Sequence, residues 1–140
     1  MNKRQFLASS LAAAAGTAGG VSAAGAQEGN DARRMVKLVF LLNRRSGMDL
    51  DDFRRYWRDE HSQIGSALPG LRKYVQNHSG ASLDGSPLPC DGFAELWFDD
   101  MESLNAALTS PEGLAALADS ENFLDVERIQ TFVVEEITII

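Results

Sequence analysis

The sequence contains a single cysteine, Cys90, and this scarcity excludes two kinds of structural element. A lone thiol cannot close a disulfide within its own chain, and it cannot supply the paired cysteines of a small zinc site. Basic residues are also in deficit, with 13 Lys and Arg against 20 Asp and Glu. Because binding to nucleic acid or anionic membranes needs a surplus of positive charge, the composition argues against both partners. We expect Cys90 to be a small core or strand-edge residue.

A hydrophobic run long enough to span a membrane is missing too, and the first 26 residues have the order of an export signal. Lys3 and Arg4 give a positive start, and the small residues at 24–26 suit a signal peptidase. The apolar stretch between them is broken by glycines before it reaches ~20 residues. The order Lys-Arg-Gln-Phe-Leu resembles the twin-arginine signature, with Lys3 in place of the first arginine. The alternative is a disordered, Ala-rich tail.

Three segments follow from this pattern: a cleavable twin-arginine-like signal at 1–26, a polar linker at 27–34 and one domain at 35–140. Removing the signal takes away two basic residues and changes the net charge from −7 to −9. We expect the mature protein to be exported to a bacterial periplasm and to be soluble there, without a membrane anchor. Its acidic character favours a neutral or apolar ligand.

From residue 35 onward, apolar runs alternate with helical periodicity. Helices are expected from Asp49 to about Ala67, from Asp99 or Asp100 onward, and again from Ser110-Pro111, with Ser as N-cap and Pro in the first turn. The expected strands are 35–42, 71–78, 92–98 and 129–140. The order β-α-β-β-α-β predicts an α+β, ferredoxin-like fold with a four-stranded antiparallel sheet.

The third and fourth predicted strands are apolar on both faces. Phe93 and Trp97 alternate with Ala94, Leu96 and Phe98, and the last strand repeats this pattern. Because the predicted helices can cover one face only, the other face must be buried in another way. We infer a symmetric homodimer in which the two sheets pack together. The alternative is a larger ligand cavity on that face.

Two histidines are candidates for chemistry. His61 follows Trp57 by four residues on the apolar side of the first helix, where an imidazole suits proton transfer near neutral pH. The alternative is a core histidine bonded to a backbone carbonyl. His78 shares one strand face with Tyr74 and Gln76, a polar row that could line a pocket. Its alternative is a solvated position at the strand end.

Carboxylates of the third strand are further candidates. Asp91 and Glu95 lie on the same side as Phe93 and Trp97, where an apolar setting could raise a carboxyl pKa for acid–base work. Pairing with an arginine is the alternative. Tyr56 stands one step off the apolar helix face and could reach a cavity edge. Phosphate loops, Gly-x-Ser-x-Gly elbows and closely spaced metal ligands are absent from the sequence, so we expect no metal site.

Residues 53–61, FRRYWRDEH, resemble the F-x-x-Y-W-x-x-x-H helix of EthD-type proteins. The strand before this helix, residues 69–77 and 91–98, and the segment 123–125 look like that family as well, over roughly residues 35–138. The resemblance implies membership of the dimeric α/β-barrel superfamily: a homodimer with a pocket between sheet and helices in each subunit. Many relatives act without metal or organic cofactor, and the matching helix histidine is His61.

We therefore expect an enzyme without a bound cofactor that acts on a small apolar cyclic or aromatic compound. His61 would be the general acid/base, with His78 and Asp91 as further catalytic residues, in an isomerisation, cyclisation, dehydration or oxygenation. The residues expected to contact substrate are Tyr56, Trp57, Tyr74, Gln76, Phe93, Glu95 and Trp97. A non-catalytic periplasmic binder or oxidase accessory protein is the alternative, and a haem binder with an axial histidine is a third.

Overall fold

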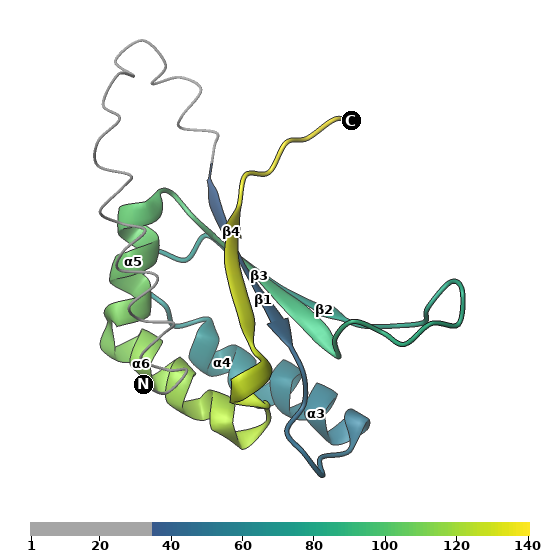
Figure 1. The fold of residues 1–140 in the computed structure, drawn as a ribbon. Coiled ribbons are helices and arrows are strands. Elements are labelled where there is room, and N and C mark those ends of the chain that lie inside the picture. Colours follow the sequence, from purple (N-terminus) through teal and green to yellow (C-terminus); the bar gives the residue numbers. More distant parts are fainter. Residues whose placement is uncertain (1–34) are drawn as a thin grey trace.

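A four-stranded antiparallel sheet carries helices on one of its faces in the computed structural model, which describes residues 35–140 (Figure 1). The strands lie in the order β2-β3-β1-β4. Their bounds are β1 Val36–Leu42, β2 Lys73–His78, β3 Gly92–Phe98 and β4 Gln130–Val134. The predicted α+β, ferredoxin-like order is confirmed. The expected signal at 1–26 and linker at 27–34 lie outside the described residues.

The first helical segment is built from three consecutive pieces. α3 (Leu50–Tyr56) is followed by the π-helical turn η1 (Trp57–His61) and by α4 (Ser62–Gly65). As expected, Asp49 caps the start and accepts a hydrogen bond from the Asp51 amide at 3.3 Å. The expected helix is therefore present, with a π-helical turn inside it at η1, where the Ser62 amide reaches the Trp57 carbonyl five residues back. Such π turns are rare and occur often at functional sites.

The second helical segment has the two caps that the sequence predicts. Asp100 accepts from the Ser103 amide at 2.7 Å and begins α5 (Met101–Thr109). Ser110 then ends α5 and begins α6 (Pro111–Asp119). Two short 3-10 turns, η2 (Ser120–Asn122) and η3 (Val126–Arg128), lead into β4. Within residues 35–140, no helix is both long and apolar enough to cross a membrane.

The hydrophobic core lies between the helices and the sheet face that they cover. Strand register places Leu38 opposite Leu96 and Phe40 opposite Ala94 on that face. The largest side chains that are fully buried in this layer are Trp57, Phe53, Phe98, Phe123, Leu38 and Leu104. Phe53 joins the helix to the rest of this core, since its ring centroid is 5.6 Å from Trp57 and 5.8 Å from Phe123.

The opposite sheet face has no helix over it in the described chain, and it carries both apolar and charged side chains. Phe132 on β4 remains 44% exposed. Lys37 on β1 lies 2.9 Å from Glu95 and 4.7 Å from the Trp97 ring centroid. Burial tends to raise the pKa of Glu95, but the hydrogen bonds from Lys37 and Asn77 outweigh it and hold that pKa below its ordinary value. Of the two alternatives for Glu95, a raised carboxyl pKa or an ion pair, the structure shows the ion pair, with Lys37 in place of the suggested arginine.

The last predicted strand, 129–140, was too long. β4 ends at Val134, which pairs with Lys37 near the start of β1. Because β1 begins at Val36, later residues have no strand beside them in the described chain. Figure 1 shows the C-terminal segment leaving the sheet after β4. Ile137 and Ile139 are 71% and 86% exposed there.

Candidate functional site

A mostly apolar cavity of about 460 Å³ lies between the helix-covered sheet face and the helices α4, α5 and α6. Its volume is in the range that holds drug-sized molecules. Among the described residues, the lining contains no Lys or Arg. The polar side chains that reach the cavity wall are His61, Tyr74, Asn105, Thr109, Ser120 and Thr131.

His61 forms a close pair with Asp119, the last residue of α6. Its Nδ1 lies 2.7 Å from Oδ2 of Asp119, and the two side chains are 13% and 10% exposed. The imidazole packs on Phe123, with ring centroids 4.7 Å apart. No residue in the described part of the chain hydrogen-bonds to the other ring nitrogen, Nε2, and His61 is one of the residues that line the cavity.

Three donors hold the Asp119 carboxylate in place. The Tyr56 hydroxyl donates to Oδ1 at 2.6 Å, and the Asn122 amide donates to the same oxygen at 3.0 Å. Burial tends to raise the pKa of Asp119, but the hydrogen bonds from Tyr56, His61 and Asn122 outweigh burial and keep the pKa below its ordinary value. Asp119 is therefore an ionised acceptor at neutral pH.

The ionised carboxylate determines the state of His61. Burial lowers the pKa of His61 and outweighs the hydrogen bond and charge of Asp119, which raise it. The ring is therefore neutral at pH 7. Since Asp119 can only accept, the single ring proton sits on Nδ1 and the lone pair sits on Nε2. This arrangement makes Nε2 a proton acceptor at the cavity wall.

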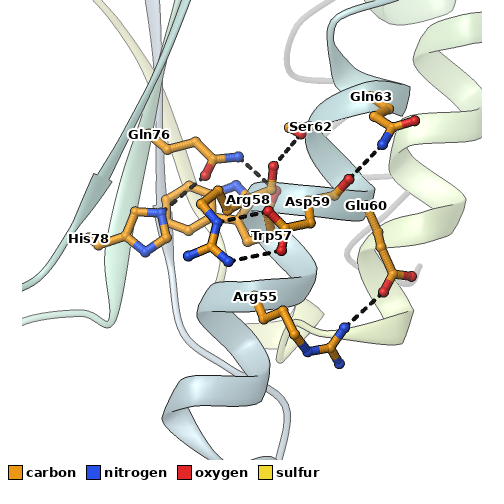
Figure 2. Close-up of polar contacts among 9 residues, drawn as sticks. All are labelled: Arg55, Trp57, Arg58, Asp59, Glu60, Ser62, Gln63, Gln76 and His78. Atoms are coloured by element: carbon orange, nitrogen blue, oxygen red, sulfur yellow. Dashed lines mark hydrogen bonds and ion pairs between the residues drawn. The ribbon is translucent and has the colours of Figure 1, made fainter.

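Gln76 links the sheet to the π-helical turn (Figure 2). Its amide nitrogen lies 2.8 Å from the Trp57 carbonyl and 3.0 Å from the Tyr74 hydroxyl, and its Oε1 lies 3.0 Å from Nε2 of His78. Burial, with the nearby charges of Arg54 and Arg58, lowers the pKa of His78.

His78 is not brought to His61. It stacks on the indole of Trp57 at 4.6 Å between ring centroids, and it is not part of the cavity wall. Trp57 and Tyr74 line the cavity. Gln76 does not line it, but its amide hydrogen-bonds to both of them. Tyr56 reaches the site only through Asp119. His78 thus shares a face of β2 with Tyr74 and Gln76, as expected, but it does not contact His61.

The remaining expected site residues lie elsewhere. Asp91 precedes β3 and accepts from the Arg44 amide at 2.9 Å, in an open polar hollow beside Arg45 and Arg128. Phe93, Glu95 and Trp97 lie on the uncovered sheet face, because strand residues two apart share one face and their neighbours Ala94 and Leu96 line the cavity. The expectation that these four residues share a pocket with His61 is corrected accordingly.

Asp119 was missed by sequence reasoning, although a signal for it exists. A carboxylate at the C-terminal end of a helix faces the negative end of the helix dipole, which disfavours it. An aspartate at the end of α6 is thus out of place unless other groups bind it. The structure supplies those groups 58 and 63 residues earlier, in His61 and Tyr56.

Thr131 is a second missed residue, and it leads to a stability prediction. Its hydroxyl oxygen is buried at the cavity wall without a hydrogen-bond partner among the described residues. A buried unpaired hydroxyl costs about 1–3 kcal/mol, so Thr131→Val, which keeps the shape, is expected to raise the free energy of unfolding by about 1 kcal/mol. Urea denaturation of the ligand-free protein measures this change.

Thr109→Val is the matched control, because the Thr109 hydroxyl donates to the Asn105 carbonyl at 2.9 Å. We expect this variant to be no more stable than the wild type. A loss of stability in Thr131→Val would show that its hydroxyl is satisfied in the folded protein.

Residues 45–127 match the family model described as the EthD domain. An uncharacterised 11.0 kDa protein from the thcB-thcC intergenic region of Rhodococcus erythropolis is 30% identical over 71 residues, which cover 51% of this chain and 68% of that protein. The crystal structure of an EthD-family protein from Bacillus halodurans is 27% identical with a TM-score of 0.64, over 74% of this chain and 99% of the other. A dimeric ferredoxin-like protein from Thermobifida fusca is 20% identical with a TM-score of 0.54, over 74% and 92% of the two chains. This chain belongs to the EthD domain family.

Proposed function

We propose that this protein is an acid–base enzyme that transfers a proton to and from a neutral, apolar cyclic or aromatic molecule held in the cavity. The observation that carries the proposal is the His61–Asp119 pair: Nδ1 is held 2.7 Å from a carboxylate, and the free Nε2 belongs to a residue of the cavity wall. A neutral imidazole oriented by a carboxylate is a general base of suitable strength near neutral pH.

The pair also supports the second half of a proton transfer. When Nε2 accepts a proton from substrate, the ring becomes an imidazolium whose charge is balanced by Asp119. The same nitrogen can then return the proton to another atom of the substrate, which completes an isomerisation. General acid–base catalysis of this kind contributes about 10²–10⁴-fold in rate.

The cavity wall favours an uncharged substrate. Apolar side chains such as Leu108, Leu117 and Ile129 make up most of it, and a charged ligand would lose its hydration there without gaining an ion pair. The buried Asp119 carboxylate repels an anion further.

The proposal is tested by hydrogen exchange. 2-Tetralone, an apolar bicyclic ketone with acidic protons next to its carbonyl, is incubated in D₂O with wild type or with His61→Gln, and NMR follows the loss of those protons. We expect exchange above the buffer rate in the wild type and a fall in that excess of about 10²-fold or more in His61→Gln. The wild-type rate should be retained at pH 6.5 and decrease only at lower pH, because protonation of His61 removes the base and burial holds its pKa below that ordinary value.

His78→Gln is the matched control, since it removes the other histidine from a position outside the cavity wall. It is expected to exchange at close to the wild-type rate. Equal rates in wild type and His61→Gln would refute the role of His61.

A second candidate function is capture of an apolar molecule without chemistry, as a binder or as an accessory to an oxidase. The observation that favours it is the small number of polar groups on the cavity wall. Binding of 2-tetralone to the wild type, detected by ligand NMR, together with exchange no faster than in buffer, would establish this function and exclude the enzyme.

We further propose that the protein works as a homodimer joined through the uncovered sheet face. Support comes from the exposed Phe132 on that face and from the Thermobifida fusca neighbour, which is described as dimeric. A monomer mass in light scattering at micromolar concentration would contradict this assembly.

Export is the last part of the proposal. The order of residues in 1–26 supports a signal that is removed after Ala26, which leaves the mature protein in the periplasm. N-terminal sequencing of the protein from a periplasmic fraction should begin at Gln27. A chain that starts at Met1 and stays with the cytoplasmic fraction would refute export.

A further inference from the structure

We propose that the Tyr74 hydroxyl donates a hydrogen bond to the ligand, and that the ligand is therefore a ketone. Its carbonyl oxygen would accept from Tyr74, and an acidic C–H bond next to the carbonyl would face His61. This inference rests on the proposed function in one respect, the role of His61 as base. The role of Tyr74 as donor depends on a different set of contacts and can be tested separately.

The orientation of the Gln76 amide is fixed by its neighbours. A backbone carbonyl only accepts hydrogen bonds, so the Gln76 atom 2.8 Å from the Trp57 carbonyl must be the NH₂ group (Figure 2). The other end of the amide, Oε1, then accepts from Nε2 of His78 at 3.0 Å. Both ends of the amide are thereby assigned.

The amide orientation in turn assigns the Tyr74 hydroxyl. The Gln76 NH₂ group lies 3.0 Å from the Tyr74 oxygen, and an amide nitrogen can only donate, so that oxygen is an acceptor in this bond. The hydroxyl proton is left to point elsewhere. No residue between 35 and 140 accepts it, and Tyr74 lines the cavity. Burial raises the pKa of Tyr74 and outweighs the hydrogen bonds from Gln76 and Trp57, so the hydroxyl keeps its proton.

Tyr74 and His61 reach the same part of the cavity. Gly65 follows His61 by four residues, which places the two on one side of the helix in consecutive turns, about 5–6 Å apart. A β-carbon at Gly65 would lie 3.9 Å from the Tyr74 hydroxyl oxygen and 3.4 Å from its ring. Tyr74 therefore packs against Gly65, one helical turn after His61, and both side chains line the wall of one cavity.

A donor and a base on the wall of one cavity match the needs of enolisation. Nε2 of His61 takes the proton from the carbon next to the carbonyl, and the C–H electron pair forms a C=C bond. The C=O π electrons move to oxygen, where the Tyr74 O–H stabilises the developing negative charge. Return of a proton to the same carbon restores the ketone with its hydrogen exchanged, and return to the far carbon of an enolate conjugated with a further C=C bond shifts that double bond. Neither outcome needs an oxidant or a reductant.

The test compares two ligands that differ by one oxygen. 2-Tetralone and tetralin share the same bicyclic frame, but only the ketone can accept from Tyr74. We expect wild type to bind the ketone about fivefold more tightly in ligand-observed NMR titrations, since a neutral hydrogen bond contributes about 1 kcal/mol. Tyr74→Phe, which keeps the ring in the core, should bind the two ligands equally and should also lose most of the excess exchange.

Thr109→Val is the control for removal of a hydroxyl from the wall, because the Thr109 hydroxyl donates to the Asn105 carbonyl. It should keep the wild-type preference for the ketone, because its hydroxyl is already bonded within α5. A Tyr74→Phe protein with a wild-type melting temperature and an unchanged preference for the ketone would overturn the role of Tyr74. Absence of exchange in the wild type would instead overturn the base, and the ketone preference would then still report on Tyr74 alone.

Discussion

Replacement of Asp119 by asparagine is expected to lower the excess exchange of 2-tetralone by about 10²–10⁴-fold, as large an effect as loss of the base itself. An amide NH₂ at this position would donate to Nδ1 of His61 and leave the ring proton on Nε2, where the lone pair is needed. The variant also lacks the negative charge that balances the imidazolium formed during the reaction. The asparagine side chain fits the same space as the aspartate, so the fold should be retained.

Nitrogen-15 NMR of the histidine side chains distinguishes this mechanism from general damage. The wild-type ring should show its proton on Nδ1, and Asp119→Asn should show it on Nε2 with a lower pKa, because Asp119 raises that pKa in the wild type. Asp99→Asn is the control: Asp99 is an aspartate 52% exposed that pairs with Arg72 on the surface. If Asp119→Asn keeps both the Nδ1 proton and the wild-type rate, the carboxylate does not orient His61.

Much of this fold could be predicted because its boundaries depend on neighbouring residues. Asp49 and Ser110 bind amides two and three residues later in their own helices, and such caps can be read from sequence. Two features depend on distant parts of the chain. The end of β4 at Val134 depends on where β1 begins, and the π turn at Trp57–His61 has its first carbonyl bound by Gln76 on β2.

In the candidate site, too, features that depend on neighbouring residues could be predicted, and contacts between distant parts of the chain could not. Helical spacing placed His61 beside Trp57, and alternation along β2 grouped Tyr74 with Gln76 and His78 on one strand face. The same alternation placed Phe93 and Trp97 on one face of β3, but it could not decide which face the helices cover. Asp119 lies 58 residues after His61 and comes close to it only through the packing of α6. Contacts between elements were therefore the part that sequence patterns did not supply.

Gly113→Ala is expected to destabilise the protein by about 3 kcal/mol or more, because there is no room for a side chain where α6 meets α5. A β-carbon at this position would lie 2.6 Å from the Leu108 carbonyl oxygen and would collide with the Ala107 carbonyl oxygen as well. Both obstacles are backbone atoms, so rotation of a side chain cannot relieve them. Urea denaturation measures the loss. Gly80→Ala is the control, since a β-carbon there meets nothing within 4 Å and should change stability by less than about 0.5 kcal/mol.

The same substitution connects the packing of the fold with the chemistry of the site. Gly113 lies in the first turn of α6, and Asp119 ends that helix. If the alanine is accommodated by tilting α6 away from α5, the far end of the helix moves and the 2.7 Å contact between Asp119 and His61 is lost. The folded fraction of Gly113→Ala should then show the nitrogen-15 signature of Asp119→Asn and its slow exchange. A destabilised variant whose folded fraction keeps the wild-type signature would mean that the dyad is held by Tyr56 and Asn122 independently of the α5–α6 contact.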